Sequence, residues 1–320
     1  MSSLFERDDI YVATGKANVE NIASQLSEVN PLHVIGEPAR RDLGPAVGLA
    51  AAIIGKNFPD EPLAYIWGAD QIYKNEDKYR SMFSIAQHYL EQDPQKLILL
   101  GETPRFANQN VGWISFGDTV TVQEGISFNT FEGFHAKPEI SIAQSYCDDG
   151  KHAWNIGDFI TTPSKILSLY REYAPELYAK LMEIQEAYQT DAFDEVLDRA
   201  YPEMAEISLD NAIFEKMDHS HALVMSADVG YADIGSWNTY KEAFEENNQA
   251  VVTKRNVRTY NSQNSLIFNA KDETLVVALD VYDVVVVNTG DVIFVARKSS
   301  IQHIKDVVKD LKESDLEHLT

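Results

Sequence analysis

The chain has 320 residues, 44% of them hydrophobic, which is enough for one large or two moderate domains with a substantial core. It carries 27 Lys and Arg against 50 Asp and Glu, giving a formal net charge of −23. This balance argues against nucleic-acid binding, which needs a basic surface, and against docking on an anionic membrane. We therefore expect neither partner and attribute the acidity to a solvated surface.

The N-terminal sequence and the cysteine content bear on the compartment. The opening MSSLFERDDI lacks the basic and then apolar pattern of a signal peptide, and no stretch is long and apolar enough to span a membrane. Cys147 is the one cysteine, so no internal disulfide can form. A reducing cytoplasm is the expected location.

Strands and helices alternate over the first part of the chain. Strands are expected over residues 10–14, 32–35, 62–70 and 96–100, with helices over about 18–29, from Pro45 onward and over about 75–92. Such alternation predicts βαβ units and a parallel sheet with flanking helices.

From residue 103 the pattern changes to short extended segments, with a short helix after Pro138. A helical insert is expected from Pro163 to about Leu197, with its apolar stripe in the core. A strand over 221–228 then leads towards Asp233, and a helix from Ser236 closes the first domain.

The segment NNQAVVTKRN, residues 247–256, is interpreted as a linker. Short strands separated by turn residues follow it, and the chain ends in a helix over 300–313 with one apolar face. We therefore predict two domains, residues 1–247 and a small β domain over residues 248–320.

Two acids far apart in the chain are the first candidates for a site. Asp70 ends the buried strand PLAYIWGAD, and ligands of open α/β sheets gather at the carboxyl ends of strands. A carboxylate there suits a divalent metal that is shared with phosphate, although an acid at such a position also often caps a helix or a turn. Asp233, in VGYADIGSW, is the second acid.

Further motifs lie around and between these acids. In chain order they are EPARRDLGPA from Glu37, WGADQ from Trp67, FHAKP from Phe134, WNIGDF from Trp154, SLDNAIFEK from Ser208 and YADIGSW from Tyr231. In order and spacing they resemble the E-P-x-G-R-N-T-A-P-A, L-P-A-D-H, F-V-E-K-P, W-N-S-G-M-F, S-I-D-x-x-V-M-E-K and W-S-D-V-G-S-W motifs of the sugar-phosphate nucleotidyltransferases. The resemblance is closest to the mannose-1-phosphate guanylyltransferases and covers nearly the whole chain.

The resemblance implies a fold and a reaction. The fold would be an α/β, Rossmann-like, mostly parallel nucleotidyltransferase sheet with flanking helices, followed by a small C-terminal β-rich domain that ends in a helix. The substrates would be GTP and mannose 1-phosphate, the products GDP-mannose and pyrophosphate, and the cofactor Mg²⁺. Charge accumulates on phosphate oxygens in such a transfer, so catalysis is mainly positioning and electrostatic stabilisation.

The resemblance also assigns roles to individual residues. Asp70 and Asp233 would hold Mg²⁺, and Lys137 would supply a positive charge to the sugar phosphate. The residues implied on the nucleotide side are Glu37, Arg41, Asp42 and Pro45. Those implied on the sugar side are Gly112, Asn155, Asp210 and Glu215.

Each role has a plainer alternative. Lys137 could be a solvated loop lysine, Asn155 a turn residue, and Glu215 a charge on a helix surface. Asp210 could simply begin a helix. Arg41 follows Arg40, so the match to the family arginine could shift by one position.

The sequence also departs from the family pattern. It lacks the opening strand and the loop G-G-x-G-T-R-L-x-P, whose backbone N–H groups hold the triphosphate, and its first strand resembles the family's second. The strand that is missing would normally lie in the middle of the sheet. Substitutions fall inside the expected site at Asp42, Leu43, Gln71, Asn110 and Ala136.

Three hypotheses follow. The chain is an active nucleotidyltransferase, a truncated and non-catalytic homologue with a binding or structural role, or one piece of a split enzyme that a segment of another chain completes. A homo-oligomer is also compatible with the sequence.

Overall fold

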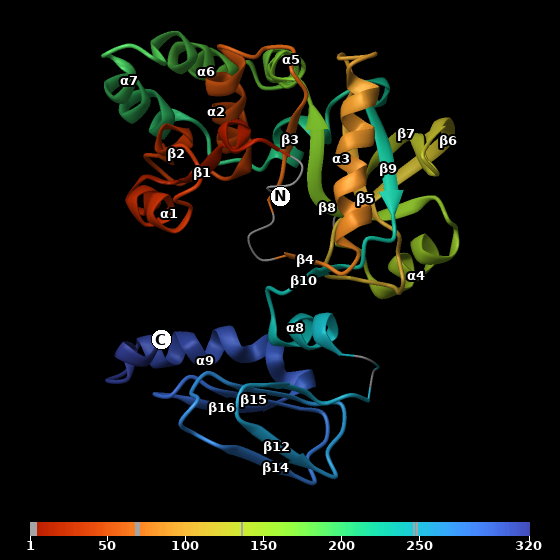
Figure 1. Ribbon diagram of the computed structural model, residues 1–320, viewed down its shortest axis with the longest axis vertical. Coiled ribbons are helices and arrows are strands. Elements are labelled where there is room, and N and C mark those ends of the chain that lie inside the picture. Colours follow the sequence, from red (N-terminus) through yellow and green to blue (C-terminus); the bar gives the residue numbers. More distant parts are fainter. Residues whose placement is uncertain (1–4, 68–70, 136, 246, 248) are drawn as a thin grey trace. The chain divides into compact units, whose positions relative to one another are not determined.

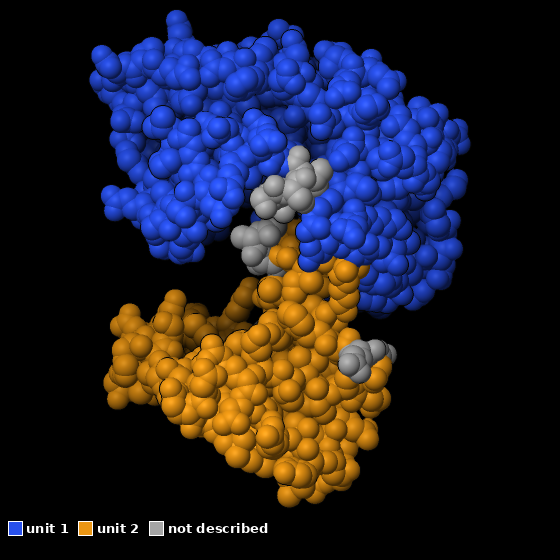
Figure 2. All heavy atoms as spheres, viewed as in Figure 1, with its two compact units in different colours: residues 1–67, 75–229 blue, residues 68–74, 230–320 orange. Residues whose placement is uncertain are grey.

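The computed structural model describes residues 5–67, 71–135, 137–245, 247 and 249–320 (Figure 1). The chain divides into two compact units (Figure 2). Unit 1 comprises Met1–Trp67 and Asn75–Val229, and unit 2 comprises Gly68–Lys74 and Gly230–Thr320. The predicted domain boundary after residue 247 stays a prediction.

A six-stranded sheet forms the centre of unit 1. Its order is β3 (Leu63–Tyr65), β8 (His152–Thr161), β5 (Leu97–Glu102), β9 (Ala222–Ala227), β7 (Ile126–His135) and β6 (Trp113–Gln123). β5 and β9 are parallel, and the other described ladders of this sheet are antiparallel. Helices α3 (Glu76–Leu90) and α4 (Ile140–Asp148) pack against it (Figure 1). The predicted α/β fold class is confirmed, with a mixed sheet in this part of the molecule.

A smaller parallel sheet joins the first two strands of the chain. β1 (Val12–Gly15) pairs with β2 (Val34–Glu37), and α1 (Val19–Gln25) connects them, as the alternation of elements predicts. Among the described residues, β1 forms a ladder with β2 alone and β3 with β8 alone. One edge of each strand thus carries no strand partner in the described part of the chain.

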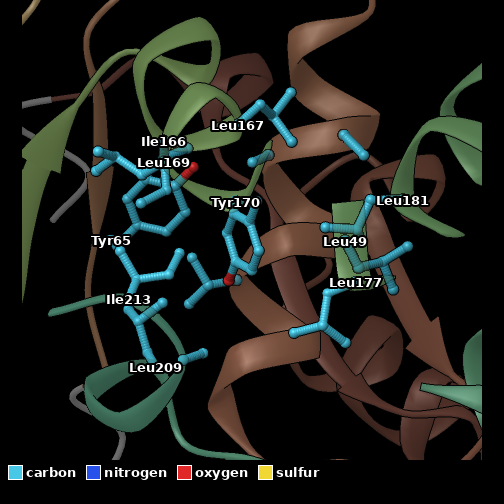
Figure 3. Packing of buried hydrophobic residues seen from close by; sticks show 14 of the residues in the cluster. Leu49, Tyr65, Ile166, Leu167, Leu169, Tyr170, Leu177, Leu181, Leu209 and Ile213 are labelled. Carbon is cyan, nitrogen blue, oxygen red and sulfur yellow. The ribbon is translucent and has the colours of Figure 1, made fainter. Parts of the chain in front are cut away.

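Helices cover the remaining core of unit 1. The predicted insert consists of α5 (Pro163–Tyr173), α6 (Pro175–Ala187) and α7 (Phe193–Ala200), because Pro175 cannot continue α5 but suits the first turn of a new helix. α5 and α6 pack on α2 (Leu43–Gly55), where a Cβ on Gly48 would lie 2.4 Å from Cδ1 of Leu181. Figure 3 shows Leu49 of α2, Tyr170 of α5 and Leu181 of α6 in this core.

Unit 2 contains two stacked coils of short parallel strands. β11 (Val252–Lys254), β13 (Leu266–Asn269) and β15 (Val284–Asn288) stack in register, β16 (Ile293–Arg297) adds antiparallel to β15, and β12 (Val257–Tyr260) pairs with β14 (Val276–Leu279). Paired residues are 19 apart from β12 to β14 and from β13 to β15, as in the buried bond from Nδ2 of Asn288 to Oδ1 of Asn269 at 2.9 Å. From β11 to β13 the offset is 14.

The corners of the coils use residues that tolerate a positive φ. Asn261 (φ 47°), Asn264 (φ 44°), Asp280 (φ 56°) and Asp283 (φ 55°) occupy matching corners, and Asn and Asp enter this region more readily than other non-glycine residues. The side chains of Asn261 and Asn264 donate to those of Asp280 and Asp283. Side-chain bonds between coils therefore support the turns.

Two helices, a short ladder and several short turns complete the description. α8 (Trp237–Phe244) and the terminal α9 (Ile304–Lys312) belong to unit 2, as do β4 (Gln71–Tyr73) and β10 (Tyr231–Asp233). The segment Asp210–Phe214 is a π-helical turn. Short 3₁₀ turns lie at Arg7–Asp9, Lys16–Asn18, Pro31–His33, Tyr201–Glu203, His219–His221, Lys298–His303 and Glu317–Leu319. Over the described residues no helix has the length and apolarity to cross a membrane.

The helix core provides a stability test. Leu49 is fully buried, so Leu49→Ala should lower the free energy of unfolding by about 2–5 kcal/mol through lost burial and a cavity. Leu32 is 81% exposed, so Leu32→Ala should change it by less than about 0.5 kcal/mol. Chemical denaturation of both variants measures the difference. Equal losses would contradict this packing.

Candidate functional site

Asp233 lies at the end of a short antiparallel ladder. β10 pairs with β4 so that Asp233 is opposite Gln71, the residue that follows Asp70 in the chain. Asp70 itself and Ala136 lie outside the described residues. Asp233 is exposed, and its Oδ1 accepts a hydrogen bond from the backbone N–H of Gly235 at 2.7 Å.

Side chains of this ladder fix its register. The ring of Tyr73 lies 5.8 Å from that of Tyr231, and the Tyr73 hydroxyl donates to Oε1 of Gln71 at 2.7 Å. After Asp233 the chain enters α8 through a capping box between Ser236 and Thr239. Asp233 therefore occupies a short link between a ladder and a capped helix.

Gly112 and Asn155, two residues expected on the sugar side, lie together. The backbone N–H of Asn155 donates to the carbonyl of Gly112 at 2.8 Å, and its Oδ1 accepts from the N–H of Gly157 at 2.9 Å. Asn155 is half-buried. These two residues are therefore neighbours in the structure, although they are far apart in sequence.

Three acids from both predicted subsites form a second group. Asp210 lies mostly buried, and its burial raises the pKa of the carboxyl group, with the negative charges of Glu215 and Asp42 adding to the effect. Asn211 holds Glu215 through a 2.9 Å bond from Nδ2 to Oε2. Asp210 and Glu215, which we assigned to the sugar, and Asp42, which we assigned to the nucleotide, are therefore close enough to interact.

Backbone bonds join the two segments that carry these acids. Gly44 donates to the carbonyl of Ile207 at 2.9 Å, and Ile207 donates to the carbonyl of Arg41 at 3.2 Å. Asp42 has φ 63° and ψ −177°, a strained conformation for a residue other than glycine, and its carboxylate caps α2 by accepting from Leu43 N at 2.7 Å. This strain sits at a position expected to face the nucleotide.

Contacts within unit 1 hold three of the residues expected on the nucleotide side, Glu37, Arg41 and Pro45. Oε2 of Glu37 accepts from the Tyr201 hydroxyl at 2.6 Å, and Nε of Arg41 donates to the carbonyl of Pro202 at 3.0 Å. Burial and the bond to Glu37 raise the pKa of Tyr201. Pro45 is buried in the first turns of α2. The sequence offered no sign that the turn at Tyr201 anchors Glu37 and Arg41.

Lys137 lies between the end of β7 and the start of α4, and its side chain is exposed. For this lysine we find no side-chain hydrogen bond or ion pair within the described ranges. Its solvated position is compatible with both of the readings that the sequence left open.

The described residues contain no group of three or more His, Cys, Asp or Glu side chains that would hold a metal by themselves. Mg²⁺ does not require one, because it commonly binds one or two carboxylates together with water and substrate phosphates. Asp233 supplies an exposed hard oxygen, so the chemistry of this residue fits the ion.

Comparison with known proteins defines the family. Residues 2–250 match the family model of nucleotidyl transferases, and residues 256–311 match the model of the MannoseP isomerase/GMP-like beta-helix domain. The chain therefore belongs to the nucleotidyl transferase family.

Individual relatives show which members of the family this chain resembles. The mannose-1-phosphate guanylyltransferase of Escherichia coli K12 is 29% identical over 91% of this chain and 60% of its own length. The protein of that name from Salmonella typhimurium LT2 is 30% identical, with the same shares. The chain thus spans about 60% of the length of these curated relatives. The predicted resemblance is confirmed.

Solved structures agree on the fold. A crystal structure described as mannose-1-phosphate geranyltransferase from Thermus thermophilus has a TM-score of 0.83 and 22% identity, over 97% of this chain and 86% of that one. A mannose-6-phosphate isomerase from Helicobacter pylori has a TM-score of 0.54 and 15% identity, over 70% and 84%. These likenesses concern the fold alone.

From the raised pKa of Asp210 we predict that the stability of the fold depends on pH. Because the pKa of Asp210 is raised in the folded state, the stability due to its proton is present at low pH and is lost as the pH rises through the folded pKa. Asp210→Asn cannot ionise, so it should raise the unfolding temperature at neutral pH, and this gain should disappear at acidic pH. Thermal unfolding across pH measures it, with the exposed Asp118→Asn as the control. A gain that is constant with pH would contradict this account.

Proposed function

We propose that this chain transfers a guanylyl group from GTP to mannose 1-phosphate, giving GDP-mannose and pyrophosphate. The observation that carries the proposal is the ladder that sets Asp233 opposite Gln71, directly after Asp70 in the chain. The family membership and the names of the relatives support the reaction and its two substrates.

In this reaction an oxygen of the sugar 1-phosphate attacks the α-phosphorus of the triphosphate, and pyrophosphate leaves. We assign Asp70 and Asp233 as the residues that would hold Mg²⁺, which when bound supplies positive charge to the phosphate oxygens. The ammonium of Lys137 attracts the sugar phosphate.

The sugar is assigned to the Gly112 and Asn155 pair. Oδ1 of Asn155 already accepts from Gly157, so its Nδ2 is the group that we assign to a sugar hydroxyl. The bond from Asn155 N to the carbonyl of Gly112 fixes the backbone of Asn155, from which this side chain extends. Fixed donors of this kind lower the barrier by positioning the reactants before the reaction.

The test is a pyrophosphate-release assay on this chain with GTP, mannose 1-phosphate and Mg²⁺. Turnover should require the metal, and Asp233→Asn should lower kcat/KM about 100-fold or more, because a ligand of the charge-stabilising ion is lost. Asp228→Asn is the matched control, since this exposed acid lies in the same segment outside the assigned site. Absence of turnover with any nucleoside triphosphate and sugar phosphate would defeat the proposal.

A second candidate is a non-catalytic binding protein. The observation that favours it is the group of Asp42, Asp210 and Glu215, which sets negative charge where the nucleotide and sugar are expected. Like charges there would repel a triphosphate. Calorimetry decides between the two candidates, because metal-dependent binding of GTP by this chain would count against the second one.

Calorimetric titration with GTP also tests how the charge of Asp42 affects the affinity for the nucleotide. Asn keeps the capping oxygen and tolerates a positive φ, so Asp42→Asn removes the charge with little change in the backbone. We expect it to tighten GTP binding about fivefold, equivalent to about 1 kcal/mol of repulsion removed. The exposed Asp118→Asn serves as the control, and equal affinities of the two variants would remove Asp42 from the nucleotide site.

A further inference from the structure

The short turn Tyr201–Glu203 holds two charged side chains that the family resemblance implies on the nucleotide side. The hydroxyl of Tyr201 donates to Oε2 of Glu37 at 2.6 Å. The carbonyl of Pro202 accepts from Nε of Arg41 at 3.0 Å and also from its Nη2. These partners lie 164 and 161 positions apart in the chain. The turn therefore joins two distant segments of unit 1.

The turn is itself fixed by its surroundings. Tyr201 is fully buried and belongs to the hydrophobic core of unit 1. The backbone N–H of Met204 donates to the carbonyl of Tyr201 at 3.1 Å, which closes the turn. At its far end, Glu203 forms an ion pair with Lys180 of α6. The phenol of Tyr201 thus has a set position from which its hydroxyl reaches Glu37.

The chemistry of the phenol determines the direction of this bond. Burial raises the pKa of Tyr201, and the bond to Glu37 adds to the rise. The phenol therefore keeps its proton at neutral pH and donates it to the carboxylate. A hydrogen bond to an ionised acceptor is shorter and stronger than one between neutral groups. Oε2 of Glu37 is consequently held in one place.

The second oxygen of Glu37 is left for a ligand. Over the described part of the chain, Oε1 of Glu37 accepts no hydrogen bond. Glu37 is half-buried and is the last residue of β2, which is parallel to β1. The carboxyl ends of parallel strands are where ligands of α/β sheets gather. Oε1 therefore lies at an edge where a ligand is expected.

A fixed carboxylate oxygen can distinguish purine bases. An ionised carboxylate accepts hydrogen bonds but cannot donate them. On its pairing edge, guanine carries N–H donors on both N1 and N2, whereas adenine has an acceptor at N1. A carboxylate oxygen that cannot swing away would meet the donors of guanine and would face the lone pair of adenine. Such an arrangement favours guanine.

We propose that Tyr201 is a positioning residue, which holds Glu37 so that Oε1 accepts from the N–H groups of guanine. The inference rests on the proposed function, in which GTP is the nucleotide substrate. Tyr201 does not touch the nucleotide in this proposal and acts through Glu37. Its contribution is to base selection, because a base that leaves fixed polar groups unpaired is rejected.

The test compares the binding of GTP and ATP to the full chain by calorimetry in the presence of Mg²⁺. Tyr201→Phe removes the hydroxyl and keeps the buried ring. It should weaken GTP binding about fivefold and leave ATP binding within about twofold, so that the preference for GTP falls about fivefold. A general loss of stability would weaken both nucleotides alike, and the ratio of their affinities therefore reports positioning.

Tyr173→Phe is the matched control. Its hydroxyl accepts from the backbone N–H of Asp218 at 3.1 Å, in the same unit but without contact to Glu37. The ratio of the GTP and ATP affinities should stay within about twofold of the wild type.

Glu37→Asp is a second variant, which also serves if Tyr201→Phe does not fold. It keeps the charge but is one methylene shorter, so it cannot reach both the Tyr201 hydroxyl and the base. The preference for GTP should fall about fivefold or more.

The outcomes separate the two proposals. A wild-type preference for GTP in Tyr201→Phe or, if that variant does not fold, in Glu37→Asp overturns the positioning role and leaves the proposed function standing. Equal weakening of GTP and ATP overturns it too, as does a wild-type chain that binds both nucleotides equally. If the wild-type chain binds no GTP, the proposed function fails and this inference fails with it.

Discussion

The register break between β5 and β8 is the constraint on which the candidate site depends. β8 is hydrogen-bonded to β3 and β5 near its end and to β5 and β6 near its start, so the residues between cannot shift freely. Within this fixed frame, Asn155 meets Gly112, and Gly157 and Asp158 meet Trp67. One irregular strand thus sets Asn155 beside Gly112 and holds Trp67.

The sequence predicted those features that local patterns encode. Alternating elements predicted the α/β class, and the resemblance to the family implied that Gly112 and Asn155 both lie on the sugar side. The direction of β8 was not predictable in this way, because strand–helix alternation favours parallel ladders whereas β8 pairs antiparallel with both neighbours. The 19-residue offset of unit 2 was readable, since Asn261 and Asn264 recur as Asp280 and Asp283.

Other features depend on tertiary contacts that a sequence does not show. The interaction of Asp42 with Asp210 arises because backbone bonds join residues 41–44 to Ile207. Another case is that β1 and β3 each form a single ladder among the described residues. The open edge of a strand carries unpaired N–H and C=O groups, a feature that local sequence patterns do not encode.

For the proposed transfer, the charges of the predicted site residues favour a metal-dependent reaction over one that uses side-chain cations alone. The cations among the predicted site residues are Arg41 and Lys137, and Arg41 already donates to the carbonyl of Pro202. Asp42, which follows Arg41, interacts with Asp210, as does Glu215, and these acids belong to a chain with a net charge of −23. The negative charge of a triphosphate and a sugar phosphate together would be larger than the single positive charge of Lys137 can neutralise. In the proposed reaction, a divalent ion held by carboxylates would resolve this imbalance, because it would turn two acids that repel phosphate into ligands of an ion that attracts it.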